Sequence, residues 1–431
     1  MENFLETKPM QQTSEMENKD DLDNFFEEFI SSKPIFKDKA VLQSNYIPEK
    51  ISHREEYLKD MAKILAPALR GERPSNVFIY GKTGTGKSLC ISHVLSKMIN
   101  IASAREIPLK LVTVNCKLKK VADTEYRILL EILKQLGKEM PSTGISTNDL
   151  YKALHEALDV KKRTVLLVLD EIDSLIKKAG DDILYNLTRI NPELKLSEVS
   201  IVGITNDLTI MDTVDARVKS SLNEEEIVFM PYNAVQLQDI LNDRAIRAFQ
   251  INVLDEEVIP RCSAYAAREH GDARRALELL RFAGELAERD GAEKILSEHI
   301  ENADKKTERN RILDVIKSQP KQFQLVNYAI IKTSMKEKHN LVTGQKSTFI
   351  EPTTTGNVYD YYNKLAKDLR VPTLTLRRIS DIIIELEVLG LINFKIVSKG
   401  RYGRTRFITI DLPKTLYNEV LGILKEELCV V

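Results

Sequence analysis

The sequence of 431 residues contains no tryptophan and only four cysteines, which lie far apart at Cys90, Cys116, Cys262 and Cys429. There is no C-x-x-C pair, and the six histidines show no metal-type spacing, so neither a disulfide framework nor a zinc site is expected and a reducing cytoplasm is favoured. The sequence also lacks an apolar run that could span a membrane, and its acidic N-terminus lacks the basic and apolar regions of a signal peptide. We therefore expect a cytoplasmic protein with no membrane partner.

An excess of charge of either sign is missing as well, because 63 Lys and Arg residues face 64 Asp and Glu residues and the net charge is −1. The total charge thus indicates no partner, and only the distribution of charge along the chain is informative. Hydrophobic residues make up 43% of the chain and charged residues 29%, as in an ordinary globular protein. The length predicts two to four domains.

A phosphate-binding loop is present at residues 81–88, which read G-K-T-G-T-G-K-S and match the complete pattern G-x-x-x-x-G-K-S/T. An apolar run at 76–80 precedes the loop and apolar residues at helical spacing follow it, so a strand, a glycine turn and a helix are expected in that order. Backbone N–H groups at such a helix start bind phosphate. We expect Lys87 to reach the β/γ-phosphates and Ser88 to bind Mg²⁺. The nucleotide-binding set is Gly81, Lys82, Thr83, Gly84, Thr85, Gly86, Lys87, Ser88 and Leu89.

A second apolar run, Thr164–Leu169, ends in the carboxylates Asp170 and Glu171, which is the layout of a Walker B strand. Asp170 is placed to hold the magnesium ion and Glu171 to activate a water for attack on the γ-phosphate, so ATP hydrolysis is expected. A further strand pattern at 199–204 is followed by Asn206, whose amide can position that water or touch the γ-phosphate.

Two arginine-containing segments complete the candidate site. Arg217 lies in D-A-R-V-K-S-S-L, and its side chain either enters the nucleotide site of a neighbouring subunit as an arginine finger or is an ordinary surface cation. The segment G-D-A-R-R-A-L at 271–277 opens a helix, and one of its arginines can fold back onto the phosphates and let a lid sense ATP.

The pattern along the chain predicts an α/β core. Residues 1–33 are acidic with little periodicity and are expected to form a mostly disordered tail. Between 34 and 226, strands alternate with helices, which predicts a parallel sheet covered by helices on both faces. The predicted strands are 76–80, 110–115, 164–169 and 199–204, and the predicted helices include 88–101, 124–137, 147–158 and 181–190.

Residues 227–305 are predicted to form an all-α lid, in which Asn233 and Gln236 cap one helix and 272–289 form another. Further along, residues 331–356 are rich in Lys, Thr, Ser and Gly and are predicted to be a long loop.

The C-terminal segment, 306–431, carries a pattern that favours DNA binding. Helices are predicted at 358–369 and 373–389, and two strands at 391–397 and 405–411 flank the basic tip K-G-R-Y-G-R. The alternative is a solvated basic hairpin, but the helix-turn-helix in front of it favours a DNA-binding wing. The start of the second helix is expected to contact base edges and the wing to contact phosphates. The candidate DNA-binding residues are Thr373, Thr375, Arg377, Arg378, Lys399, Arg401, Tyr402, Arg404 and Arg406.

Taken in order, these motifs resemble those of an AAA+ ATPase, and the details, including Y-I-P at 46–48, H-R-E at 53–55 and the tip G-R-Y-G-R-T, resemble the archaeal replication-initiator family. That family is related to the largest subunit of the eukaryotic origin recognition complex and to its helicase-loading partner. The resemblance implies adenine contacts at Tyr46, Ile47 and Pro48, sensor 1 at Asn206, the arginine finger at Arg217 and sensor 2 at Arg274. Ala216 stands where the family usually has proline.

The same resemblance implies a fold made of an α/β AAA+ P-loop core, an all-α lid and a C-terminal winged helix. It also implies an additional initiator helix near 117–127, where Lys117, Lys119, Lys120 and Arg127 are candidates for DNA contact.

The expected function is that of a slow, ATP-dependent DNA replication initiator whose ATP or ADP state acts as a switch and whose nucleotide is bound with Mg²⁺. The expected partners are double-stranded origin DNA, paralogous initiator subunits and the replicative minichromosome-maintenance-type helicase, which would place the protein at the nucleoid. The alternatives are a clamp-loader-like AAA+ ATPase, which would lack a winged helix, and a winged-helix transcription regulator that uses ATP to set its oligomeric state.

Overall fold

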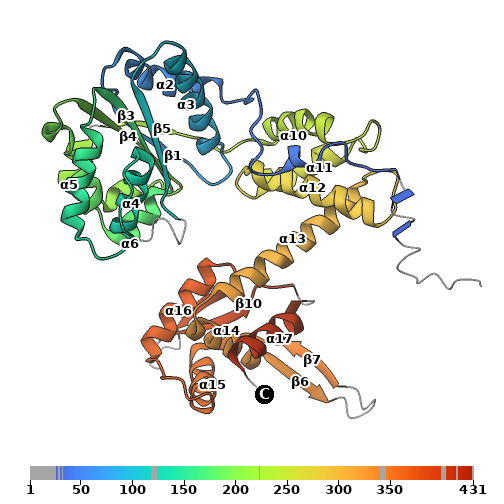
Figure 1. Ribbon diagram of the computed structural model, residues 1–431. Helices are drawn as coiled ribbons and strands as arrows, with labels where there is room; N and C mark the ends of the chain where they lie inside the picture. Colours follow the sequence, from blue (N-terminus) through green and yellow to red (C-terminus); the bar gives the residue numbers. More distant parts are fainter. Residues whose placement is uncertain are drawn as a thin grey trace, which may run out of the picture. The chain divides into compact units, whose positions relative to one another are not determined.

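The structure is a computed structural model that describes residues 26–27, 30–31, 33–117, 124–222, 224–339, 346–398, 404–413 and 416–429. The chain divides into two compact units, Met1–Glu301 and Asn302–Val431 (Figure 1). Most of the predicted acidic tail lies outside the described residues, as do Lys119, Lys120 and the wing tip at 399–403. No helix in the described ranges is long and apolar enough to cross a lipid bilayer.

A five-stranded parallel sheet forms the centre of the first unit, with the strand order β2-β3-β4-β1-β5. Its strands are β1 (Asn76–Tyr80), β2 (Leu109–Asn115), β3 (Arg163–Asp170), β4 (Ser197–Thr205) and β5 (Glu224–Val228). The first four confirm the predicted strands. Sequence analysis missed β5, because its three glutamates hide a short strand that lies at the sheet edge.

Helices cover both faces of this sheet, as predicted. On β1, Phe78 and Tyr80 point to one face and Val77 and Ile79 to the other, which is the alternation of a strand buried on both sides. Packed on the first face are α4 (Glu125–Leu136), α5 (Thr147–Leu158), α6 (Ile172–Ala179), α7 (Asp182–Thr188), α8 (Ile210–Thr213) and α9 (Ala216–Leu222). Packed on the second face are α2 (Glu55–Leu65), α3 (Lys87–Ala104) and the 3₁₀ turn η2 (Ala66–Arg70).

The rest of the first unit is the helical lid. It contains α10 (Ala234–Ala248), α11 (Val258–Arg268), α12 (Ala273–Arg289) and the start of α13 (Ser297–Ser318). The predicted capping pair is confirmed: Asn233 accepts the backbone N–H of Gln236, whose side chain accepts the backbone N–H of Asn233.

The segment that precedes the core packs on the lid. Phe36 stacks on Phe249 with ring centroids 4.9 Å apart, and the backbone N–H of Lys37 donates to the carbonyl of Ala248 at 2.8 Å. A short 3₁₀ turn, η1 (Lys39–Leu42), follows. This segment continues into residues 43–48, so the stretch of chain directly before the predicted base-binding residues is attached to the lid.

The second unit is a winged helix. Its elements are the end of α13, α14 (Lys321–Ser334), α15 (Thr355–Asp368), α16 (Leu376–Val388), the three-stranded sheet β8 (Thr353–Thr354), β10 (Arg404–Ile410) and β9 (Ile392–Ser398), and α17 (Tyr417–Leu428). The stripe Ile379, Ile382, Ile383 and Leu386 of α16 is buried in its core, as the periodicity predicts. Thr375 caps α16, so this helix begins at Leu376 and not at Thr373 as predicted.

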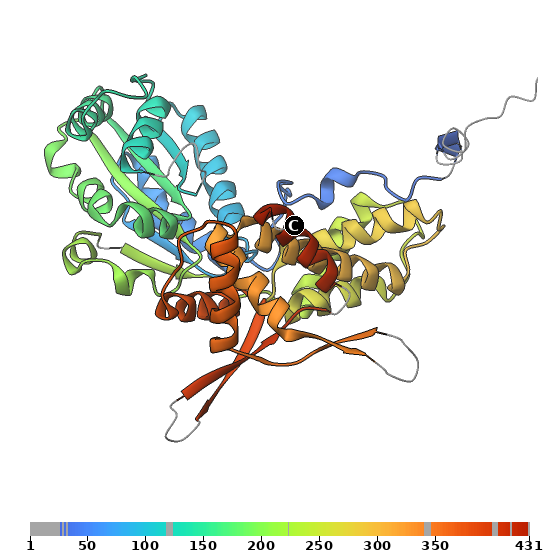
Figure 2. The ribbon, with the colours of Figure 1, turned by 90° about the horizontal axis from the view of Figure 1, so that it is seen from below.

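The predicted loop at 331–356 is wrong. α14 extends to Ser334, and two antiparallel strands follow, β6 (Met335–His339) and β7 (Lys346–Ile350), which Figure 2 shows side by side. Met335 pairs with Ile350. Neither strand, M-K-E-K-H or K-S-T-F-I, alternates apolar and polar residues, so the pattern from which a strand is recognised is missing.

Candidate nucleotide site and nucleic-acid interface

The phosphate-binding loop lies between the end of β1 and the start of α3, as predicted. Gly81, Gly84 and Gly86 all have positive φ, at 151°, 70° and 91°. Gly84 also has no room for a side chain, because a Cβ there would overlap the carboxylate of Asp272 at the start of lid helix α12. Lys82 and Thr83 form the exposed part of the loop. The loop therefore turns at its glycines, and at Gly84 it lies directly against the lid.

Lys87 is the buried cation of the loop. Lys87 is only 6% exposed. Its ammonium group donates hydrogen bonds to the carbonyls of Gly81 and Lys82 and, at 2.8 Å, to Oδ1 of Asn206. Burial is the main reason that the pKa of Lys87 is lowered, to about 8; the guanidinium of Arg274 acts in the same direction, and the nearby carboxylates, Asp170 foremost, oppose the shift. The predicted sensor 1 residue and the loop lysine therefore lie together.

The two predicted magnesium ligands also meet. Ser88 Oγ donates to Asp170 Oδ2 at 2.9 Å, and the other carboxylate oxygen of Asp170 accepts the backbone N–H of Glu171 at 2.9 Å. A hydroxyl and a carboxylate oxygen beside a phosphate loop form the hard-oxygen donor set that Mg²⁺ prefers. The side chains present thus fit a magnesium ion held together with nucleotide phosphates.

Glu171 stands in an unusual backbone conformation directly after β3. Its φ is 55° and its ψ 45°, in the left-handed region that non-glycine residues seldom occupy, and it is the N-cap residue directly before α6. Its Oε2 is buried without a hydrogen bond, and Lys117 Nζ lies 3.5 Å from that oxygen, beyond good hydrogen-bond geometry. A carboxylate held this way keeps an acceptor available for a water molecule, as a general base requires.

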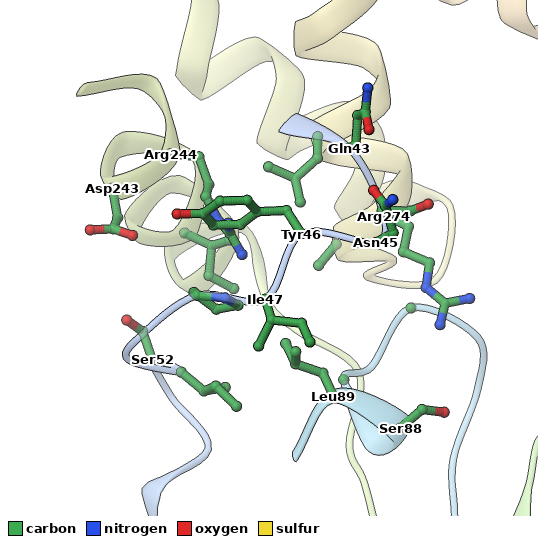
Figure 3. Close-up of a pocket in the computed structure, with 18 of the residues that line it drawn as sticks. Gln43, Asn45, Tyr46, Ile47, Ser52, Ser88, Leu89, Asp243, Arg244 and Arg274 are labelled. Carbon is green, nitrogen blue, oxygen red and sulfur yellow. The ribbon is translucent and has the colours of Figure 1, made fainter. Parts of the chain in front are cut away.

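A cavity of about 250 Å³ opens beside the loop, between the core and the lid (Figure 3). The predicted base-binding residues Tyr46, Ile47 and Pro48 line it, together with Leu89 from α3. Apolar lid residues and the chain before α2 complete a wall that suits a flat base. The structure thus brings the predicted base-binding and phosphate-binding residues to one cavity.

The lid supplies Arg274 to the same cavity, where its side chain extends from α12 toward the phosphate loop (Figure 3). The neighbouring Arg275 is instead engaged with Glu269, at 3.2 Å. The start of α12 also touches the loop, since the backbone N–H of Ala273 donates to the carbonyl of Gly84 at 3.2 Å. Of the two arginines in this segment, Arg274 is therefore the one that lines the cavity beside the phosphate loop.

Arg217 lies apart from this cavity. It sits at the start of α9 with its side chain 74% exposed, and both its Nε and Nη2 donate to the carboxylate of Asp215 at 3.1 Å. All the hydrogen bonds that the structure gives its guanidinium go to Asp215. Arg217 is the one predicted catalytic residue that the structure does not bring to the nucleotide site of its own chain.

In the second unit, the predicted base-reading residues form an exposed group at the start of α16. Thr373, Thr375, Arg377 and Arg378 are all exposed, and the side chain of Arg378 extends toward the C-terminal end of the helix, where it pairs with Glu385 at 3.3 Å. The hydroxyl of Tyr362 accepts the backbone N–H of Leu374 at 3.1 Å and fixes the turn that leads into this helix.

The wing is only partly within the described residues. Arg404 begins β10, whereas Lys399, Arg401 and Tyr402 lie outside the described range. Arg406 is half-buried, donates to the carbonyl of Ser380 on α16 at 3.3 Å and lies over the ring of Phe394. Arg406 therefore braces the wing against the helix in this structure.

Sequence analysis missed two buried arginines near the cavity. Arg244 of α10 is 6% exposed, lies over the ring of Tyr46 at 4.4 Å, and donates to the carbonyl of Val41 (Figure 3). It falls on the apolar stripe of α10, and a cation in such a stripe is the signal that could have revealed it. Arg54 is 3% exposed and donates to the carbonyl of Thr85 in the loop. Nothing in its local sequence indicates burial.

Comparisons with known proteins agree with this arrangement. Family models described as "AAA domain", "Cdc6 AAA+ ATPase-type lid domain" and "CDC6, C terminal winged helix domain" match residues 70–208, 238–305 and 314–420. An ORC1-type DNA replication protein of Thermococcus kodakarensis is 48% identical over 397 residues, which are 91% of this chain and 92% of that protein. A relative of the same description from Methanosarcina acetivorans is 44% identical over 402 residues, 93% of each chain.

Among solved structures, the Aeropyrum pernix ORC1 protein in complex with DNA has 42% identity and a TM-score of 0.78, with 91% of this chain and 97% of that chain covered. The predicted AAA+ core, lid and winged helix are therefore confirmed. With these similarities over nearly its whole length, the chain belongs to the family of ORC1-type DNA replication proteins, which are replication initiators built on an AAA+ ATPase core.

Proposed function

We propose that this chain binds duplex DNA at a replication origin through its winged helix and that ATP, bound between core and lid, switches its activity. The observation that carries this proposal is the combination, in one chain, of the Lys87–Asn206 and Ser88–Asp170 pairs with an exposed recognition-helix start. The relative from Aeropyrum pernix that was solved with DNA supports the DNA-binding part. We assign residues 34–226 to the core, 227–305 to the lid and 306–431 to DNA binding.

In the nucleotide site, the chain supplies charge and positioning for hydrolysis. Lys87 and Arg274 bring two cations to the position of the terminal phosphates, one from the core and one from the lid. A magnesium ion held through Ser88 and Asp170 would neutralise charge that develops on the phosphates. Glu171 takes a proton from the attacking water, and Asn206 orients the γ-phosphate or that water.

The lid makes the site responsive to the nucleotide. Arg274 comes from the lid, and the base-binding segment follows a stretch of chain that packs on the lid. ATP and ADP therefore favour different lid angles. Turnover is slow, as suits a switch. Arg217, which is exposed and paired with Asp215, acts on the nucleotide of a neighbouring initiator subunit or of another assembly partner.

On DNA, the start of α16 contacts base edges and the wing contacts phosphates. Replacing Arg377 tests the first contact, and replacing Arg404 tests the second. The initiator then helps to load the replicative minichromosome-maintenance-type helicase. The winged helix disfavours a clamp-loader-like role. A transcription regulator with the same domains would differ from an initiator in the genomic sites that it occupies.

DNA titrations test this proposal. Arg377→Ala should weaken binding to origin duplex by about 1–3 kcal/mol and bind random duplex almost unchanged if this residue reads a base. Arg404→Ala should weaken binding to both duplexes and make the salt dependence shallower by about one unit. Lys425→Ala is the matched control, because Lys425 is exposed on α17, outside the proposed DNA-binding elements.

Unchanged affinity of the Arg377 and Arg404 variants for every duplex would refute the winged-helix interface. Genome-wide footprinting separates the remaining alternatives, since an initiator should occupy one or a few origins, whereas a transcription regulator should occupy many promoters.

A further inference from the structure

Arg54 is a buried cation whose partners are unusual. It precedes α2, is 3% exposed, and in the part of the chain that the structure describes it forms no ion pair with a carboxylate. Its hydrogen-bond acceptors are backbone carbonyls, and its guanidinium lies over aromatic rings. Burying an arginine without an anion costs stability, so a role for its specific geometry is expected.

Apart from the carbonyl of the preceding residue, His53, the carbonyls that accept hydrogen bonds from Arg54 belong to two separate functional segments. Its Nε donates at 3.0 Å to the carbonyl of Thr85, which is part of the phosphate loop. Its Nη2 donates at 2.7 Å to the carbonyl of Met230, which lies in the connection between β5 of the core and α10 of the lid. We call this connection, residues 229–233, the hinge. One planar side chain thus holds a carbonyl of the phosphate loop and a carbonyl of the hinge at a fixed separation.

Aromatic residues of the hinge pack against the side chain of Arg54. The guanidinium lies 3.7 Å from the centroid of the Tyr232 ring, and Phe229, at the start of the hinge, contributes a second ring at 5.6 Å. A Cβ on Gly86 of the phosphate loop would lie 3.0 Å from the Tyr232 hydroxyl. The Tyr232 backbone N–H donates at 3.4 Å to the carbonyl of Gly271, just before the helix that carries the sensor arginine.

We propose that Arg54 is a positioning residue that couples the conformation of the phosphate loop to the angle of the lid. This inference rests on the proposed ATP switch and names the side chain that transmits it. When phosphates draw the loop N–H groups toward them, the Thr85 carbonyl moves with its peptide, and Arg54 passes that displacement to Met230 and Tyr232. Arg274 senses the phosphates directly, whereas Arg54 acts from behind the loop.

The geometry predicts which substitutions separate coupling from binding. Lysine keeps the positive charge but has no planar fork, so Arg54→Lys cannot hold both carbonyls at once. Arg54→Ala removes the donor from the buried carbonyl of Thr85 and from the partly buried carbonyl of Met230, so it should also lower stability. Asp239→Ala is the matched control, because it removes the exposed hydrogen bond between Asp239 on α10 and the His53 ring, at 2.9 Å, which is another direct contact between core and lid.

Lid angle can be followed by energy transfer between dyes on Lys161→Cys in the core and Glu256→Cys in the lid, in a full-length chain with Cys429→Ser. The signal is compared with Mg²⁺-ATP and Mg²⁺-ADP, and ATP affinity, helical circular dichroism and thermal unfolding are measured on the same samples. Arg54→Lys should bind ATP within about threefold of the parent, yet lose about fivefold or more of the ATP-versus-ADP difference in lid angle. Asp239→Ala should keep that difference.

Three results would overturn the inference. A full ATP-versus-ADP response in a folded Arg54→Lys protein would show that the lid follows the nucleotide without Arg54. Loss of ATP affinity in parallel with the response would make Arg54 a binding residue, and an equal loss in Asp239→Ala would make the effect one of general core–lid contact. A parent protein with no nucleotide response would refute the proposed switch itself, while origin binding, measured separately, would still stand.

Discussion

The protonation state of Lys87 should control how nucleotide affinity depends on pH. In the folded chain, burial lowers the pKa of this lysine to about 8. The phosphates of a bound nucleotide surround the ammonium group with negative charge and raise its pKa again. Only the protonated form binds phosphate well, so affinity is fully present below about pH 8 and is lost as the pH rises through that value.

The size of the effect follows from the pKa of Lys87. Above about pH 8, each further pH unit lowers the protonated fraction of Lys87 in the nucleotide-free protein about tenfold. The binding free energy weakens by about 1.36 kcal/mol for each such unit. Between about pH 7 and about pH 9.5, ADP affinity should therefore fall by about 30-fold, or about 2 kcal/mol. Burial raises the pKa of Tyr232, which lines the same cavity, to about 12, so this phenol does not titrate in that range.

Calorimetric titration with ADP in buffers of different ionisation enthalpy measures both the affinity and the proton taken up on binding. About one proton should be taken up at pH 9, because the nucleotide phosphates are already ionised there. Lys87→Arg is the control, since its guanidinium stays protonated throughout and its affinity, although weaker, should not depend on pH. A flat profile in the parent protein, or an equal slope in the arginine variant, would refute the assignment of this titration to Lys87.

Two further predictions concern hydrolysis. Glu171→Gln should bind ATP with unchanged affinity but hydrolyse it at least about 100-fold more slowly, and turnover at the parental rate would show that another group activates the water. Arg217→Ala should leave ATP binding by the dilute monomer unchanged while reducing assembly-dependent hydrolysis by about 10³-fold; an equal loss in the monomer would place Arg217 in its own site or give it a structural role.

The parts of the fold that sequence analysis predicted well are those specified by local patterns. The helix at 147–158 has a capping serine and an apolar stripe, and the structure gives it those bounds. The loop, the Walker B strand and Asn206 converge because the carboxyl ends of neighbouring parallel strands meet at one sheet edge. Their meeting therefore follows from topology alone.

The features that escaped prediction depend on tertiary contacts. The acidic strand β5 becomes a strand because it pairs with buried β1, and β6 and β7 pair despite a polar composition. The roles of Arg54 and Arg244 are set by carbonyls and rings that lie far from them in sequence, such as Met230 and Tyr46. No period or motif in the chain encodes such a partner.

The packing of the N-terminal segment on the lid has a consequence for how long a nucleotide stays bound. Phe36 and Lys37 attach this segment to the lid, and Tyr46 and Ile47, a few residues on, line the base side of the cavity. A lid movement that withdraws Arg274 from the phosphates therefore also withdraws the wall beside the base. If the proposed switch operates, we expect the nucleotide to lose its phosphate and base contacts in one event. A single barrier, the opening of the lid, would then set its residence time and the rate at which ADP is exchanged for ATP.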